Sequence, residues 1–166
     1  MCTALRTTIL LLSLSTMPLA SAAELSRDEA SLGARPAAFV ALSVADLERV
    51  LPFYRDALGF RVFSKGEVPD RNIRYALLQH DGALIELLEL PDARPRATVA
   101  PMIDDAAQIH GFFKSGFVVA DIDAVHARMT RSGIELAFEL GKPTNGPYRV
   151  FGVRDPEGNL LQIFGR

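Results

Sequence analysis

The stretch that decides the fold is SVADLERVLPFYRDALGF, from Ser43 to Phe60. A shortened echo of it, VVADIDAVHARMTRSGI, runs from Val118 to Ile134. Each copy follows an apolar, β-rich segment, places an aspartate before a run with helical spacing of apolar residues, and reaches a glycine where that run stops. The tripeptide Val-Ala-Asp begins at Val44 and again at Val119, 75 residues later. This repeat predicts a duplicated supersecondary unit.

In both copies the predicted helix is followed by three segments with strand character. They cover residues 60–65, 73–79 and 83–90 in the first half, and 135–140, 148–155 and 159–165 in the second. The last strands of the two halves also correspond, because Glu86 falls opposite Gln162, 76 residues later. Each half therefore reads β-α-β-β-β.

The N-terminal residues have a different character. Residues 1–6 carry one positive charge, residues 7–20 are mostly apolar, and Ala20–Ala22 is a small-x-small cleavage signal. This pattern predicts a secretory signal peptide over residues 1–22, and hence a secreted or periplasmic protein. No later stretch is long and apolar enough to cross a membrane.

The rest of the chain is expected to form one domain. A flexible lead-in covers residues 23–36, and the domain covers 37–166 with module one at 37–90, a connector at 91–112 and module two at 113–166. A short helix is expected near Ile103–Ile109 within the connector.

Composition excludes several functions. The formal charge is −2 with no basic stripe, so nucleic acid is a poor candidate partner. The only cysteine is Cys2, which leaves the mature chain without a disulfide, a thiolate nucleophile or a thiolate metal site.

Two segments carry a resemblance to a known family. FVALSVADLERVLPFYRDALGF, from Phe39, and VRDPEGNLLQIF, from Val153, resemble the vicinal oxygen chelate superfamily of glyoxalases, bleomycin-resistance proteins and extradiol dioxygenases. The resemblance implies an α+β fold in which two tandem βαβββ modules form a curled mixed sheet with a cleft, and the helices lie outside. Members often pair their modules across two chains, so a homodimer is compatible with it.

The resemblance also places a metal site at four positions, which are occupied by His or Glu, and in some members Gln, in metal-dependent relatives. Here they are Phe39, Glu86, Lys114 and Gln162. A phenyl ring has no lone pair to give, and an ammonium group repels a cation. One carboxylate and one amide fall short of the three or more protein ligands of zinc-type sites. We therefore expect no metal and no other cofactor.

Strand alternation predicts which side chains line the cleft. The apolar lining is expected to comprise Phe39, Leu84, Leu88, Val118, Leu160 and Phe164. Glu86 and Lys114 are expected to point at each other across it. Two interpretations remain open: the ammonium neutralises the carboxylate, or the pair transfers a proton on a bound ligand while Gln162 orients it. His80 and His126 are expected to be solvated, whereas His110 lies four residues before Lys114 and within reach of the cleft.

Four functions follow from these expectations. The first is a metal-free protein that binds a small, largely apolar organic ligand through Phe39, Leu84, Leu88, Val118, Gln162 and Phe164. The second is a metal-independent lyase or isomerase with Glu86 and Lys114 as catalytic residues. The others are a glyoxalase-like metal-dependent lyase or dioxygenase, and a structural subunit whose cleft has become core.

Overall fold

The computed structural model describes residues 38–142 and 146–166. The predicted signal peptide and lead-in lie outside the described residues. The segment Ala37–Arg166 forms one compact unit. No helix in the described ranges is long and apolar enough to span a bilayer.

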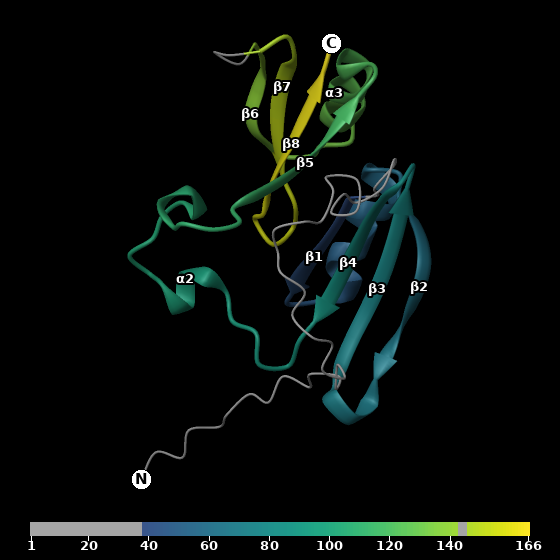
Figure 1. Cartoon of the computed structure of the whole chain (residues 1–166), viewed down its shortest axis with the longest axis vertical. Helices are drawn as coiled ribbons and strands as arrows, with labels where there is room; N and C mark the ends of the chain where they lie inside the picture. Colours follow the sequence, from purple (N-terminus) through teal and green to yellow (C-terminus); the bar gives the residue numbers. More distant parts are fainter. Residues whose placement is uncertain (1–37, 143–145) are drawn as a thin grey trace, which may run out of the picture. The chain divides into compact units, whose positions relative to one another are not determined.

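The first module follows the predicted β-α-β-β-β order. Its elements are β1 (Ala38–Val44), α1 (Leu47–Pro52), a π-helical turn η1 (Phe53–Ala57), β2 (Arg61–Val68), a 3₁₀ turn η2 (Pro69–Arg71), β3 (Ile73–His80) and β4 (Ala83–Glu89). The four strands form one sheet in the order β1-β4-β3-β2, in which β1 runs parallel to β4 and the other pairs are antiparallel (Figure 1).

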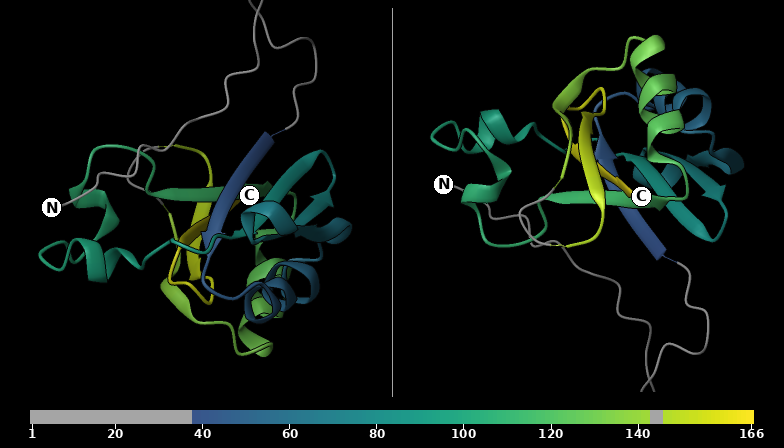
Figure 2. Two further views of the ribbon diagram at one scale, coloured as in Figure 1. Left: turned by 90° about the horizontal axis from the view of Figure 1, so that it is seen from below. Right: turned by 90° about the horizontal axis from the view of Figure 1, so that it is seen from above.

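The second module repeats this topology. It contains β5 (Lys114–Val119), α3 (Ile122–Arg131), β6 (Leu136–Gly141), β7 (Arg149–Arg154) and β8 (Leu160–Gly165), with sheet order β5-β8-β7-β6. Figure 2 shows α3 running along the strands of this sheet. Both sheets are open, and both modules have the same order of elements and strands. The predicted α+β fold of two tandem βαβββ modules is confirmed.

The connector differs in detail from the prediction. The short helix expected near Ile103–Ile109 is only a 3₁₀ turn, η3 (Ala106–Gln108). One helical turn that was not predicted, α2 (Arg96–Val99), lies earlier in the connector. Pro95 fixes an extended backbone at the N-cap of α2, and residues 91–99 are exposed, so no packed face reinforces a longer helix.

Each helix begins at the aspartate of its Val-Ala-Asp motif. The Asp46 carboxylate accepts hydrogen bonds from the backbone N–H groups of Glu48 (2.9 Å) and Arg49 (3.2 Å), and Asp121 accepts one from Ala124 (2.9 Å). These bonds satisfy donors that a helix N-terminus otherwise leaves free. The capping predicted from the repeat is therefore confirmed in both copies.

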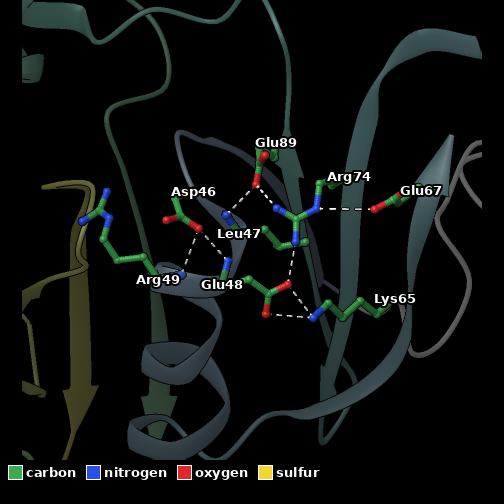
Figure 3. Close-up of polar contacts among 8 residues, drawn as sticks. All are labelled: Asp46, Leu47, Glu48, Arg49, Lys65, Glu67, Arg74 and Glu89. Carbon is green, nitrogen blue, oxygen red and sulfur yellow. Dashed lines mark hydrogen bonds and ion pairs between the residues drawn. The ribbon is translucent and has the colours of Figure 1, made fainter. Parts of the chain in front are cut away.

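A polar network fastens the start of α1 to the first sheet (Figure 3). Arg74 on β3 contacts Glu89 (2.9 Å), Glu48 (2.7 Å) and, at 3.7 Å, Glu67. Glu89 also accepts a hydrogen bond from the Leu47 N–H (2.8 Å). The Glu48 carboxylate binds a second cation, Lys65, which lowers the pKa of Glu48 below its ordinary value.

One face of each sheet is buried under its helix; we call it the outer face. On the first sheet it carries Val44, Ala76, Leu78, Ile85 and Leu87, and on the second Phe151, Val153, Leu161 and Ile163. These side chains form a single cluster with the apolar residues of the helices. The core therefore lies between sheet and helix, and the opposite face, which we call the inner face, is left open in each module.

Direct contacts join the two modules. The buried Tyr54 hydroxyl donates a hydrogen bond to Asp155 (2.7 Å), Arg49 donates to the carbonyl of Pro156 (2.8 Å), and the rings of Phe60 and Phe117 are 5.5 Å apart. Burial, with the nearby Asp155 charge, raises the pKa of Tyr54 far above its ordinary value. The phenol therefore stays protonated and acts as a fixed donor.

Candidate functional site

The inner face of the first sheet is built by strand alternation on β1 and β4. The parallel register places Phe39 beside Leu84, Ala41 beside Glu86 and Ser43 beside Leu88. The residues between them, such as Ile85 and Leu87, belong to the buried outer face. Glu86 therefore lies in the middle of an apolar sheet face, as the pattern predicts.

The second inner face is built in the same way from β5, β8 and β7. The register places Lys114 beside Leu160, Gly116 beside Gln162 and Val118 beside Phe164. Gln162 is also paired with Gly152 on its other side. The amide thus lies between two residues without side chains, and the Phe138 ring covers Gly152, where an added Cβ would meet it at 2.3 Å.

The structure places the eight predicted site residues on these two faces with different exposure. Phe39 and Val118 are exposed, at 59% and 71%. The others are half-buried: Leu84, Glu86, Leu88, Lys114, Gln162 and Phe164. These residues are therefore accessible from the open side of each sheet, and their proposed roles in binding or catalysis stay predictions.

The expected approach of Lys114 to Glu86 is not seen. Within the described residues, no ion pair joins these side chains, and the Lys114 ammonium lies 5.0 Å from the ring centroid of Phe113 instead. The cause is local: Phe113 directly precedes Lys114, and an aromatic face attracts a cation. The interpretation of Lys114 as the neutralising partner of Glu86 therefore has no support in this arrangement.

The histidines differ partly from expectation. His80 is exposed and tilts against Phe60, with ring centroids 5.5 Å apart. His126 is not solvated as predicted: it is half-buried and packs edge-on to Phe151 at 5.0 Å, and its Nε2 is a buried atom without a hydrogen-bond partner in the described part of the chain. The helical spacing that places Val125 and Met129 on the core also turns His126 toward the sheet. His110 is exposed on the connector.

A shallow depression of about 470 Å³ lies at the β3–β4 hairpin, which sequence reasoning did not single out as a site. It is lined by Gly59, Arg61, Gln79, His80, Asp81 and Gly82. Arg61 donates a hydrogen bond to Gln79 within it (3.3 Å). Two features of the sequence mark the segments that line this depression: Gly59, which follows η1, and the His-Asp-Gly turn at residues 80–82. They are far apart in the chain, and the pairing of β2 with β3 brings them together.

The paired βαβββ modules, with helices on one face and site positions on the other, match a known family. The family model for the Glyoxalase/Bleomycin resistance protein/Dioxygenase superfamily matches residues 37–163. The chain belongs to this superfamily. The resemblance inferred from the two motif segments is thereby confirmed.

Individual members of the superfamily are only distantly similar. YraH of Bacillus subtilis, described as uncharacterized, is 25% identical over 130 residues that cover 75% of this chain and 94% of YraH. A glyoxalase family protein from Enterococcus faecalis has a TM-score of 0.65 at 21% identity, with 76% of this chain and 94% of that chain covered. Glyoxalase I from Zea mays has a TM-score of 0.61 at 19% identity, with 79% of this chain and 44% of that chain covered. These structures share the fold.

The metal site of metal-dependent superfamily members does not fit the residues present here. At the four positions, Phe39 offers no lone pair and Lys114 offers a cation, which leaves Glu86 and Gln162. Across residues 38–142 and 146–166, no group of three or more His, Cys, Asp or Glu side chains is placed to hold an ion. We therefore derive no chemistry through a metal at these positions.

Proposed function

We propose that this superfamily member binds a small, largely apolar organic molecule on the inner faces of its sheets, without a metal ion. The observation that carries the proposal is the exposure of large apolar side chains there, led by Phe39 and Val118. Large apolar side chains left exposed to solvent are a feature of binding surfaces. Half-buried Leu84, Leu88 and Phe164 extend it, and the polar groups of Glu86 and Gln162 supply the few directional contacts that such sites contain.

The arrangement favours binding over the two catalytic alternatives. A lyase or isomerase with Glu86 and Lys114 as an acid–base pair needs both groups at one substrate, and Lys114 is directed to Phe113. A glyoxalase-like metal-dependent lyase or dioxygenase needs a donor set that these residues do not supply.

The proposal includes export, because of the positive charge, apolar run and small-x-small motif of residues 1–22. Export is tested by the intact mass of the protein isolated from a bacterial periplasmic extract. We expect this mass to correspond to a chain that begins at about Ala23. A mass that corresponds to the full chain would contradict export.

The binding site is tested by two matched phenylalanine substitutions with the neutral probe 1-naphthylmethanol. Phe39→Ala removes an exposed ring on the first inner face, whereas Phe112→Ala removes a ring in the connector that is 74% exposed. We expect Phe39→Ala to weaken binding about tenfold, because it deletes apolar contact area worth roughly 1.5 kcal/mol. Titration calorimetry measures the affinities.

Phe112→Ala is the control and is expected to leave the affinity unchanged. Equal affinities for Phe39→Ala and the unmodified protein would contradict the proposed site. Stoichiometric zinc, nickel, iron or manganese in protein purified without chelators would contradict the metal-free proposal.

A further inference from the structure

Glu86 presents a carboxylate in the middle of an apolar sheet face. Its neighbours across the sheet are Ala41 on β1 and Leu77 on β3. Along β4, Leu84 and Leu88 lie two residues to either side and share its face. The side chain is half-buried, so apolar groups displace part of its water shell while one side stays open.

Glu89 lies on the same strand as Glu86, and its carboxylate is paired within the protein. Glu89, on the opposite face of β4, is bound by the Arg74 guanidinium at 2.9 Å and by the Leu47 N–H at 2.8 Å. Among the described residues, by comparison, no group donates a hydrogen bond to the side-chain carboxylate of Glu86, and no cation pairs with it. Two acidic residues three positions apart are thus treated in opposite ways.

Two cations of the inner faces, Lys114 and Arg61, make contacts with other residues. Lys114, its predicted partner, lies over Phe113. Arg61 on β2 is paired with Gln79 on β3, which is paired with Leu84 on β4. The Arg61 guanidinium donates a hydrogen bond to the Gln79 side chain at 3.3 Å. Any ligand that covers the face removes the remaining water from the Glu86 carboxylate, and an unpaired charge without water is costly. The ligand itself must therefore supply the missing donor.

We propose that Glu86 recognises a cationic nitrogen, an ammonium or amidinium group, on an otherwise apolar ligand. This inference rests on the proposed binding function and names the ligand class. An ionised carboxylate only accepts hydrogen bonds, and its strongest partner is a charged N–H donor. The surrounding leucines bind the apolar body, while the same carboxylate repels ligands that carry an acid in its place.

Three probes with one ring system and different head groups test the inference. They are 1-naphthylmethylamine, which is protonated at neutral pH, 1-naphthylmethanol and 1-naphthoate. We expect the full-length protein to bind the amine about tenfold more tightly than the alcohol, because the amine makes a charge-assisted hydrogen bond, and to bind the naphthoate least. Titration calorimetry at low salt measures the three affinities.

Glu86→Gln keeps the shape of the side chain and removes its charge. In this variant we expect the amine to bind no more tightly than the alcohol. The matched control is Glu139→Gln, which makes the same charge change on an exposed side chain of β6 and is expected to keep the tenfold preference.

The outcomes separate the two levels of the proposal. Equal binding of amine and alcohol by the unmodified protein, or a preference that survives in Glu86→Gln, would overturn the recognition of a cation while leaving binding itself intact. Failure of all three probes to bind would contradict the proposed function and this inference with it.

Discussion

At the scale of single residues, the contact between Tyr54 and Asp155 joins the two halves of the chain. The Asp155 carboxylate accepts the Tyr54 hydroxyl at 2.7 Å, the backbone N–H groups of Glu157 (2.9 Å) and Asn159 (2.8 Å), and the Asn159 amide at 3.0 Å. Asp155 is almost fully buried. The Asp155 carboxylate therefore accepts hydrogen bonds both from its own turn and from Tyr54 of the other module.

Replacement of Tyr54 by phenylalanine is expected to lower the free energy of unfolding by about 1–3 kcal/mol, because it removes a buried hydrogen bond to a charged group. Urea denaturation measures this change. Tyr75→Phe is the control, since the Tyr75 ring lies over Gly66 and its hydroxyl has no protein hydrogen bond among the described residues. Equal losses for the two variants would contradict the role of the Tyr54 contact.

The same pair predicts a pH dependence. The raised pKa of Tyr54 means that the folded protein keeps the phenol proton at a pH where the unfolded chain, with a pKa near 10.0, loses it. The stability that Tyr54 contributes is therefore complete below about pH 10 and declines above it. We expect the difference in unfolding free energy between the unmodified protein and Tyr54→Phe to narrow from pH 10 upward. A free-energy difference that stays constant above pH 10 would contradict the raised pKa of Tyr54.

At the scale of elements, two glycines flank Gln162 for different reasons. A Cβ on Gly116 would lie 2.2 Å from the backbone carbonyl oxygen of Gln162, so β5 and β8 approach too closely for any side chain. A Cβ on Gly152 would instead meet the Phe138 ring, which is a side chain that can move. The second sheet thus depends on one glycine for strand pairing and on the other for ring packing.

This difference predicts unequal effects of alanine. Gly116→Ala is expected to cost about 1–3 kcal/mol of unfolding free energy, since backbone must shift, and Gly152→Ala less. Adding Phe138→Ala is expected to relieve the strain of Gly152→Ala and to leave that of Gly116→Ala unchanged. A double-mutant cycle from urea denaturation measures the coupling. Equal coupling of Phe138→Ala to the two glycine substitutions would contradict the conclusion that only Gly152 is limited by the Phe138 ring.

At the scale of the whole molecule, the modules share a core rather than folding as separate bodies. Phe60 of the first module is buried against Phe117 of the second, and the buried apolar residues of both modules belong to one cluster. Small domains with one core usually unfold in a single transition. The two modules are therefore expected to gain and lose structure together.

Phe60→Ala is expected to lower the free energy of unfolding by about 3–5 kcal/mol and to reduce amide exchange protection in β5 and β8 as well as in the first module. Hydrogen exchange followed by mass spectrometry measures both modules. Phe63→Ala, which removes an exposed ring on β2, is the control and is expected to change neither. Loss of protection confined to the first module would show that the modules are uncoupled.

The sequence by itself determined the duplicated topology, the helix caps at Asp46 and Asp121, and the faces of β4 and β8. These features depend on periodicity and on contacts between near neighbours, which a linear pattern records. The family resemblance located the metal positions, and side-chain chemistry alone argued against an ion there.

Only the tertiary structure decided which groups meet. The pairing of Tyr54 with Asp155, the packing of His126 against Phe151 and the position of Lys114 over Phe113 depend on how segments pack and on the rotamers they leave open. Side-chain contacts between residues far apart in the chain are selected by packing in three dimensions, and alternation along a strand fixes a face without fixing a partner.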